Sequence, residues 1–253
     1  MRRGTLGALA AAVALASTTA SARAERVDLN PADFTTRIDN RWWPMAPGSR
    51  WRYRESVEDG GEHAVVVTVT DATRKIANGV TARVVRDTVS EHGKVIEDTF
   101  DWYAQDRRGN VWYLGEDTAE FENGKLVTKA GSFEAGVDGA MAGVIMPAHP
   151  HDDQTYREEY YKGHAQDRAE VLSTHEMVQT PFGRQERALL TKETTPLEPH
   201  VLEYKLYAPR IGPVLTLGVS GGPGEREELL TYDKAPARWM AKARTAPLGQ
   251  GPT

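Results

Sequence analysis

VIEDTFDWYAQDRRGNVWYLGED, residues 95–117, is the stretch that decides the fold. It contains two runs rich in aromatic and β-branched residues, 95–104 and 110–114, on either side of a polar turn at residues 106–109. Such residues fit a pleated sheet, and the order strand, glycine-containing turn, strand is typical of a β-hairpin. The stretch therefore predicts two antiparallel strands that lie side by side.

The same pattern, strand-type runs separated by turns, continues on both sides of this hairpin. The dipeptides Asn78-Gly79 and Asn123-Gly124 are strong signals for tight hairpin turns. Further runs of strand type lie at residues 51–57, 64–69, 80–89, 126–133, 155–161, 169–180, 188–195, 201–207, 214–219 and 227–232. Turns that recur every ~8–12 residues are typical of all-β folds, whereas a doubly wound α/β fold would alternate strands with amphipathic helices. We therefore predict an all-β fold, a curved antiparallel meander of about a dozen strands that forms a half-barrel or an open barrel.

One glycine-rich segment interrupts this pattern of strands and turns. Residues Gly131–Pro150 read GSFEAGVDGAMAGVIMPAHP, with glycines, prolines and apolar residues interspersed. Long irregular segments inside a compact domain are usually functional. We expect this segment to act as a lid over the concave side of the sheet, or to form a short helix, Gly136–Val144, that plugs one end.

The two ends of the chain differ in composition from its middle. Arg2 and Arg3 precede an apolar run, Leu6–Ala16, and two small-x-small sites follow, which is the order of a signal peptide. We expect residues 1–24 to be removed on export, residues 25–233 to form a single β domain that opens with a helical turn near Asn30, and residues 234–253 to be a disordered basic tail. No later run is long and apolar enough for membrane insertion, and the absence of cysteine excludes disulfides.

The charge balance narrows the choice of partners. The chain has 31 Lys and Arg against 36 Asp and Glu, a net charge of −5, and residues 234–253 contain no acid at all. The preceding body is therefore more acidic than the whole chain. An acidic body argues against nucleic acid as a partner, because phosphate contacts need Lys and Arg. It is compatible with cations or neutral ligands, and it also confers solubility.

Three stretches carry a resemblance to a known group of proteins. They are IDNRWWPM (Ile38–Met45) leading into PGSRW (Pro47–Trp51), DWYAQDRRGNVWYLGED (Asp101–Asp117) and YAPRIGPV (Tyr207–Val214). Together they resemble an uncharacterised family of exported bacterial β-rich proteins, and the last stretch is similar to a YAPGVGLV hairpin from which it departs at Arg210 and Pro213. The same hairpin is similar to one in lipoprotein-carrier (LolA-like) half-barrels. That resemblance implies an apolar ligand inside a curved sheet and supplies no catalytic residues.

The central hairpin offers a candidate ligand site. If its turn is centred on Arg108, Ala104 faces Trp112, Trp102 faces Leu114 and Phe100 faces Glu116, so that alternate residues share one face. An aromatic floor with carboxylates at one end suits a small, partly apolar ligand. The predicted ligand-binding residues, with one from the glycine-rich segment, are Asp98, Phe100, Trp102, Trp112, Leu114, Glu116 and Met146. The alternative is that these aromatic pairs only hold the sheet together.

A second candidate is a metal site. The acids of the same hairpin could hold a hard divalent cation, although no EF-hand loop is present. An extended His-x-His segment followed by carboxylates has the ligand types that Zn²⁺ and Cu²⁺ prefer. The residues of this candidate site are His149, His151, Asp152, Asp153 and His164. The alternative is a solvated loop, and no other cofactor is expected.

Two patterns bear on catalysis. Asp98 and Glu116 could serve as paired carboxylates of a hydrolase. Residues Gly218–Gly222 match G-x-S-x-G around Ser220, but a nucleophile elbow needs a strand, a sharp turn and a helix, and here Pro223-Gly224 follows at once. We interpret this match as a hairpin turn.

These observations together predict a soluble extracytoplasmic protein, periplasmic or secreted, that binds a small, partly apolar ligand without catalysis. Two alternatives stay open. One is a periplasmic metal-binding protein that uses the acidic hairpin or the loop of His149 and His151. The other is a carboxylate-dependent hydrolase.

Overall fold

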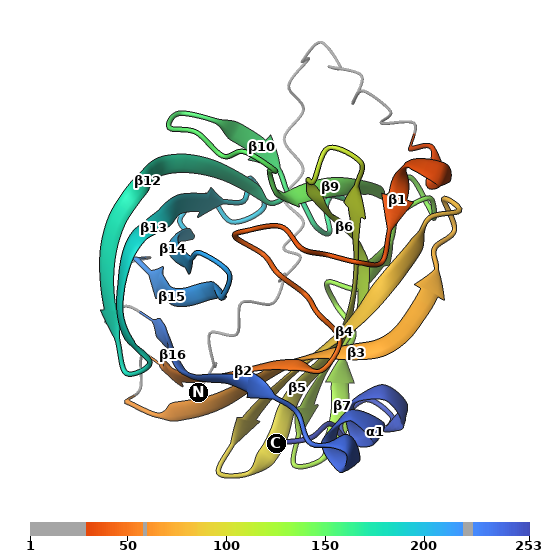
Figure 1. The fold of residues 1–253 in the computed structure, drawn as a ribbon. Helices are drawn as coiled ribbons and strands as arrows, with labels where there is room; N and C mark the ends of the chain where they lie inside the picture. The colour runs from red at the N-terminus through yellow and green to blue at the C-terminus, as the bar shows by residue number, and fades with distance from the viewer. Residues whose placement is uncertain (1–28, 58–59, 220–224) are drawn as a thin grey trace, which may run out of the picture.

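The computed structural model describes residues 29–57, 60–219 and 225–253, and its described residues form one curved antiparallel sheet (Figure 1). The predicted signal segment, residues 1–24, and Ser220 lie outside the described residues. The elements are η1 (Pro31–Asp33), β1 (Phe34–Thr35), β2 (Ser49–Ser56), β3 (Glu62–Lys75), β4 (Thr81–Glu91), β5 (Lys94–Asp106), β6 (Val111–Glu122), β7 (Lys125–Thr128), β8 (Phe133–Glu134), β9 (Met141–Met146), β10 (Thr155–Arg157), β11 (Glu159–Tyr160), β12 (Arg168–Thr180), β13 (Gly183–Thr194), β14 (Leu202–Ala208), β15 (Gly212–Gly218), β16 (Arg226–Lys234) and α1 (Ala237–Thr245).

The sheet is a nearly closed barrel, which confirms the predicted open barrel. Its strand order is β10-β12-β13-β14-β15-β16-β2-β3-β4-β5-β6-β9-β11, so most neighbours in space are neighbours in sequence. The pairing of β16 with β2 joins the two halves of the chain. The two strands at the ends of this order, β10 and β11, follow each other directly in the chain and bring the ends of the sheet together. Figure 1 shows the strands enclosing a central space.

The central hairpin forms as expected but contains a bulge. Tyr103 pairs with Tyr113 and Ala104 with Trp112, as the turn position predicts. The register then shifts beyond Tyr103, and Phe100 pairs with Asp117, so the predicted pairing with Glu116 is wrong by one residue. A one-residue slip moves a side chain to the other face of a sheet. Glu116 therefore faces the inside of the barrel.

The glycine-rich segment 131–150 belongs to the wall of the barrel. It forms β8 and β9, which both pair with β6, and the predicted helix Gly136–Val144 is wrong because residues from Met141 onward are a strand. A Cβ atom at Gly143 would lie 2.3 Å from the carbonyl group of Glu158. Glycine is needed there because the backbone that closes the barrel passes directly over it.

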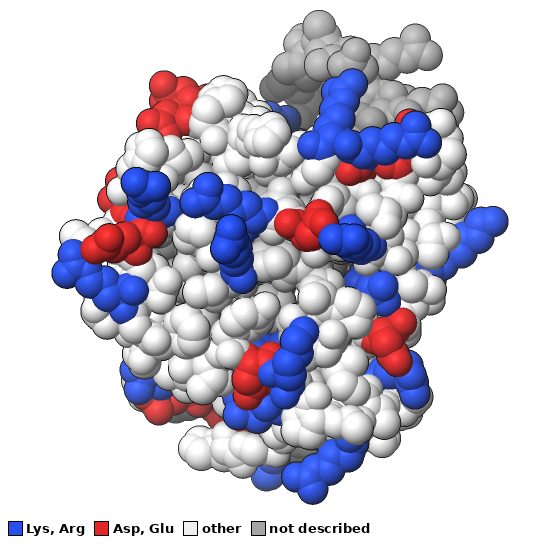
Figure 2. Space-filling model, in the orientation of Figure 1, with Lys and Arg blue, Asp and Glu red and all other residues white. Residues whose placement is uncertain are grey.

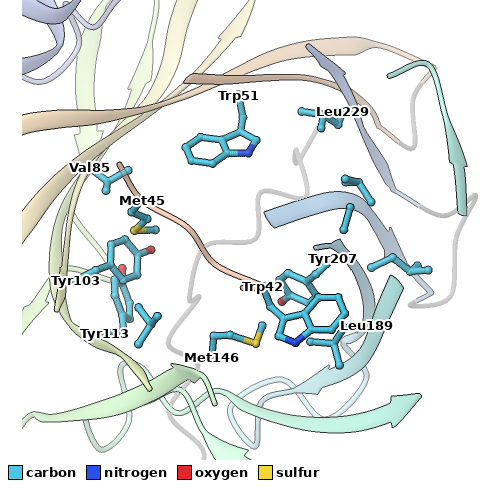
Figure 3. Packing of buried hydrophobic residues seen from close by; sticks show 14 of the residues in the cluster. Trp42, Met45, Trp51, Val85, Tyr103, Tyr113, Met146, Leu189, Tyr207 and Leu229 are labelled. Atoms are coloured by element: carbon cyan, nitrogen blue, oxygen red, sulfur yellow. The ribbon is translucent and has the colours of Figure 1, made fainter. Parts of the chain in front are cut away.

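The plug of the barrel comes from the N-terminal segment 38–45. Ile38, Trp42 and Met45 are buried in the main core, and Figure 3 shows Trp42 and Met45 inside the barrel. The side chain of Asn40 holds the segment, since it donates to the carbonyl groups of Gly109 and Pro147 at 2.9 and 3.1 Å. In the view of Figure 2, atoms fill the middle of this end, and Lys and Arg are more prominent than Asp and Glu. This end of the barrel is thus closed.

Buried apolar residues form two groups on opposite faces of the sheet. The main group fills the plugged half of the barrel, where the rings of Tyr103 and Tyr113 stack with centroids 5.0 Å apart. A smaller group, which we call the outer cluster, lies outside the barrel wall. Its buried members are Ile76, Val80, Ala82, Trp102, Ala104, Leu114, Ala135 and Ala142. Strands β4, β5 and β6 are therefore covered on both faces.

The basic end of the chain is ordered, which corrects the prediction of a disordered tail. Ala, Arg, Met and Lys favour α1, and Pro236 precedes its first residue. The helix lies against the outside of the barrel, where the indole N–H of Trp239 donates to Thr68 (Figure 1). Beyond it, the chain is held by the buried ion pair of Arg86 and Asp98. Composition alone predicted disorder, because it contains no information on the buried residues elsewhere in the chain that hold this segment in place.

Among the described residues, no helix is long and apolar enough to cross a membrane.

Candidate functional site

A cavity of about 470 Å³ occupies the half of the barrel away from the plug. The plug contacts the β5–β6 turn near Gly109, whereas the cavity reaches Glu97 and Glu120 at the far ends of the same two strands. The acidic lining residues are Glu55, Asp87, Glu97, Glu116, Glu120, Glu159, Asp167, Glu193, Glu198, Glu203 and Glu227. Lys205 and His164 are the basic residues of this lining. The interior is thus apolar at one end and strongly acidic at the other.

Strand alternation places these acids inside. In β2, Trp51 and Tyr53 face the core, and Glu55 is the next residue on the same face. In β16, Glu227 precedes the fully buried Leu229 by two residues in the same way. Sequence reasoning missed these acids because it treated them as solubilising residues. The signal that could have found them is the alternation itself, which continues from buried apolar positions directly into carboxylates.

Several of the acids face each other across neighbouring strands. The cross-strand pairs are Glu55 with Glu227, Glu97 with Glu120, Asp101 with Glu116, and Glu193 with Glu203. Like charges directly opposite each other destabilise a sheet, and burial increases the cost. This cost is reduced by protonation of some of the carboxyls or by a nearby cation.

The pKa values of several lining carboxyls are raised, which favours their protonation. Burial, and then the charge of Glu120, raise the pKa of Glu97 to about 7. Burial, and then Glu55, raise the pKa of Glu227 to about 8. Burial also raises the pKa of Asp87 well above its ordinary value, with the charge of Asp101 as the next cause. Glu97 and Glu227 therefore exchange protons near neutral pH, where ordinary carboxyls are fully ionised.

One tyrosine links a pair of these acids. The hydroxyl oxygen of Tyr113 lies 2.7 Å from Oδ1 of Asp101 and 2.9 Å from Oε2 of Glu116. A hydroxyl has one proton, so Tyr113 donates to one carboxyl and accepts from the other only if that second carboxyl is protonated. Burial raises the pKa of Asp101 to about 7, although the hydrogen bond with Tyr113 acts in the opposite direction. Asp101 is 8 % exposed and does not line the cavity, so the pair cannot flank a substrate bond.

Lys205 neutralises a different pair of acids. Its Nζ lies 2.5 Å from Oε2 of Glu193 and 3.5 Å from Oε2 of Glu203. Burial lowers the pKa of Lys205, but the charges of Glu193, Glu203 and Glu158 together raise it by more, and the result lies well above the ordinary value. Lys205 is therefore a fixed cation and not a nucleophilic amine. It compensates one side of the cavity. Elsewhere in the described lining, Glu55 has the imidazole of His63 beside it at 2.9 Å, whereas Glu97, Glu120 and Glu227 form no ion pair.

This arrangement predicts an unusual pH dependence of stability. Carboxyls whose folded pKa is raised bind more protons in the folded than in the unfolded state, so the stability they contribute is complete below pH ~4 and is lost as pH rises through about 7–8. Without added ligand, we expect the protein to lose roughly 2–4 kcal/mol of unfolding free energy between about pH 5 and pH 8.5. Urea melts at several pH values measure this loss. Glu227→Gln should flatten the slope, and a stability that stays constant or rises over this range would contradict the assignment.

The structure separates the residues of the predicted aromatic ligand site. Trp102 is only 4 % exposed and packs with Leu114 in the outer cluster, while the guanidinium of Arg74 lies 4.0 Å from the centroid of the Trp102 ring. Trp112 is half-buried beside this cluster, and Met146 is buried in the main core on the other face. These residues do not form one surface. The binding role predicted for them has no common pocket here, and Glu116 alone of the predicted set lines the interior cavity.

Asp98 and Phe100 lie outside the barrel under the C-terminal segment. Asp98 is fully buried in its ion pair with Arg86, whose guanidinium lies 4.4 Å from the centroid of the Phe100 ring. Since Glu116 faces the interior, Asp98 and Glu116 are on opposite faces of the sheet. The predicted pairing of these two carboxylates in a hydrolase is therefore wrong.

The residues of the predicted metal site are exposed and do not converge. His149, His151, Asp152 and Asp153 are exposed in the loop after β9. His164 lies elsewhere, at the mouth of the interior cavity, where its ring stacks on Tyr161. Within the described part of the chain, no three His, Asp or Glu side chains form a group that could hold a metal ion.

Comparison with known proteins gives two similar solved structures. No family model and no curated protein matches the chain. A protein from Bacteroides fragilis, described as exported and with a YmcC-like fold, is 19 % identical with a TM-score of 0.45, over 77 % of this chain and 100 % of that one. A protein from Parabacteroides distasonis, described as a lipoprotein, is 12 % identical with a TM-score of 0.42, over 77 % of this chain and 99 % of that one.

Proposed function

We propose that this protein is an extracytoplasmic binding protein that holds a small, cationic and partly apolar molecule in the acid-lined half of its barrel. The observation that carries the proposal is the set of in-register acid pairs around a cavity of about 470 Å³. The signal-type start of the sequence supports export. The proposed ligand is small and partly apolar, as the sequence suggested, but its site is the interior and not the aromatic face of the central hairpin.

The acid pairs favour a cationic ligand on energetic grounds. A positive group placed between Glu55 and Glu227, or between Glu97 and Glu120, would offset the repulsion within these pairs. Charge-assisted hydrogen bonds to carboxylates are also stronger than neutral ones. Because Lys205 already compensates Glu193 and Glu203, we expect the cation to bind among the lining acids that form no ion pair with it, such as Glu97, Glu120 and Glu227.

The size and the remaining lining favour an organic amine over a bare ion. A volume of about 470 Å³ is within the range of small-molecule sites, which are commonly ~300–1,000 Å³. Apolar contact surface comes from the ring of Tyr113 and from Ala130, Leu197 and Val201, all of which line the cavity. A molecule with one or two amines and a short apolar body would use both kinds of lining.

Calorimetric titration of the full protein tests the proposal. The probes are spermidine, benzylamine and, as a neutral counterpart, benzyl alcohol, each at pH 6 and pH 8. The amines stay protonated at both pH values, whereas Glu97 and Glu227 have pKa values of about 7 and about 8. Binding should therefore release protons and be about tenfold tighter at pH 8 for each carboxyl that must ionise.

Paired variants locate the site. Glu227→Gln should weaken amine binding by about tenfold, while Glu186→Gln, at an exposed position of β13, should leave it unchanged. Tighter binding of benzyl alcohol than of benzylamine would contradict the proposal. Saturable binding of Ca²⁺ or Zn²⁺ without any amine binding would support the metal-binding alternative instead.

A further inference from the structure

A second recess, which we call the seam groove, lies on the outside of the barrel where the ends of the sheet meet. Its volume is about 580 Å³. It runs between β9 on one side and β10, β12 and β13 on the other. At the base of the groove, Gly143 of β9 lies directly against the backbone of Arg157 and Glu158. Thr194 lines both this groove and the acid-lined cavity, but the charged residues of the two recesses differ, and the inference drawn from the groove does not depend on the proposed function.

The seam groove is basic, in contrast to the interior. Arg157, Arg168 and Lys192 line it together with a single acid, Glu170, which forms an ion pair with Lys192 at 3.0 Å. Arg157 and Arg168 are directly opposite each other in the β10–β12 pairing. In the described part of the chain, neither arginine forms an ion pair or donates a hydrogen bond from its guanidinium, and Arg157 lies over the ring of Tyr160 at 5.1 Å.

Two opposed arginines without a carboxylate repel each other, and an anion between them would offset that repulsion. Like charges at directly opposed positions destabilise a sheet. Burial, and then the charge of Arg168, lower the pKa of Arg157, which reports the same repulsion. Guanidinium groups on adjacent strands present several N–H donors in planar forks, the geometry that matches the oxygens of a phosphate group.

The groove also has an aromatic wall. Trp112 lines it and is half-buried, and its indole N–H donates to Asp106 at 3.0 Å, which fixes the ring. The ring of Phe34 packs against that of Trp112 with centroids 6.0 Å apart and near-perpendicular planes. Trp112 belongs to the predicted aromatic site and lines this groove on the outside of the barrel. A flat or apolar body attached to the anion would find its contact surface here.

From this combination we propose that the seam groove binds a phosphate monoester, with the phosphate between Arg157 and Arg168 and its apolar or flat body against Trp112. A dianionic phosphate balances the two arginines, and the Lys192–Glu170 pair at the rim contributes no net charge. A soluble phosphate monoester and the headgroup of a phosphatidic acid share this chemistry, and the test separates these two sources.

The test is calorimetric titration of the full protein with phenyl phosphate, inorganic phosphate and phenol, together with co-sedimentation on vesicles with and without phosphatidic acid. Phenyl phosphate should bind more tightly than either of its two parts. Arg168→Gln should weaken that binding by at least about tenfold, because it removes charge-assisted hydrogen bonds. Arg187→Gln, at an exposed position of β13, is the matched control and should have no effect.

Weaker binding by the Arg168→Gln variant should not result from a loss of folding. Replacing Arg168 relieves the repulsion with Arg157, so the variant should be at least as resistant to urea as the native protein. Sedimentation only with phosphatidic acid vesicles would support the site and identify its source as a lipid. The inference is overturned if neither phenyl phosphate nor those vesicles bind, if both arginine variants weaken binding equally, or if phenol binds as tightly as phenyl phosphate.

Discussion

Arg86→Ala should destabilise the protein by about 3–5 kcal/mol, because it removes one partner of a fully buried ion pair. Nε and Nη2 of Arg86 donate to the two carboxylate oxygens of Asp98 at 2.8 and 2.6 Å, and both side chains are 0 % exposed. The same guanidinium donates to the carbonyl oxygens of Ala243, Ala246 and Pro247. The substitution would leave a buried carboxylate without its counter-ion and three carbonyl groups without their donor.

The effect should extend to the end of the chain. Asp98 accepts hydrogen bonds from the backbone N–H groups of Gly249 and Gly251 at 2.8 and 3.0 Å. A Cβ atom at Gly251 would lie 2.5 Å from Oγ1 of Thr88, so the chain enters a tight slot. Hydrogen exchange of residues 243–251 should therefore rise in Arg86→Ala well beyond the rise expected from global unfolding alone.

Arg244→Ala is the matched control for this variant. Arg244 also ties the C-terminal segment to the barrel, through an ion pair with Asp71 at 2.9 Å, but its side chain is 44 % exposed. Exposed ion pairs contribute only about 0–1 kcal/mol. Urea melts of both variants measure the difference. If Arg86→Ala costs no more than Arg244→Ala, the buried pair does not anchor the segment.

Trp42→Ala should cost a similar amount, about 3–5 kcal/mol, because it empties the centre of the plug. Trp42 is buried in the main core, and its backbone N–H donates to the side chain of Asn40 at 2.8 Å (Figure 3). The neighbouring Arg41 accepts a hydrogen bond from the backbone of Arg210 at 2.6 Å. A cavity left here cannot collapse easily, because the surrounding barrel wall is continuous.

Trp239→Ala provides the comparison for Trp42→Ala. Trp239 is the same residue type, but it lies half-buried on the outside of the barrel between Arg50 and Arg52. Its replacement should cost only about 1–2 kcal/mol, since less apolar surface is lost from the folded state. Equal urea midpoints for the two variants would show that segment 38–45 covers the barrel end without stabilising it.

The three stretches that carried the resemblance to exported bacterial proteins meet at this plugged end. Asn40 of the first stretch contacts Gly109 of the second, and the indole N–H of Trp51 donates to Ile211 of the third at 2.7 Å. The hydrogen bond between Arg210 and Arg41 joins the third stretch to the first. These sequence signatures therefore describe chiefly how one end of the barrel is closed, and only the second stretch also reaches the acid-lined cavity, through Tyr113 and Glu116.

Local sequence pattern by itself determined the all-β class, the antiparallel meander and the central hairpin. These features follow from side-chain alternation and turn chemistry, which act between residues close in the chain. The turn at Asn78-Gly79 and the helical turn after Asn30 also lie where the pattern predicted them. Such signals do not depend on which distant strands become neighbours.

Only the tertiary structure decided which face of each strand is inside and what lies over the outer face. A bulge next to Tyr103 moved Glu116 to the interior, and a one-residue shift of this kind has no reliable local signal. The plug, the order of the C-terminal segment and the acid pairs all depend on contacts between residues far apart in the chain, such as Glu55 with Glu227. Alternation shows that two residues share a face, but barrel closure decides that the face encloses a cavity and that its acids stand opposite one another.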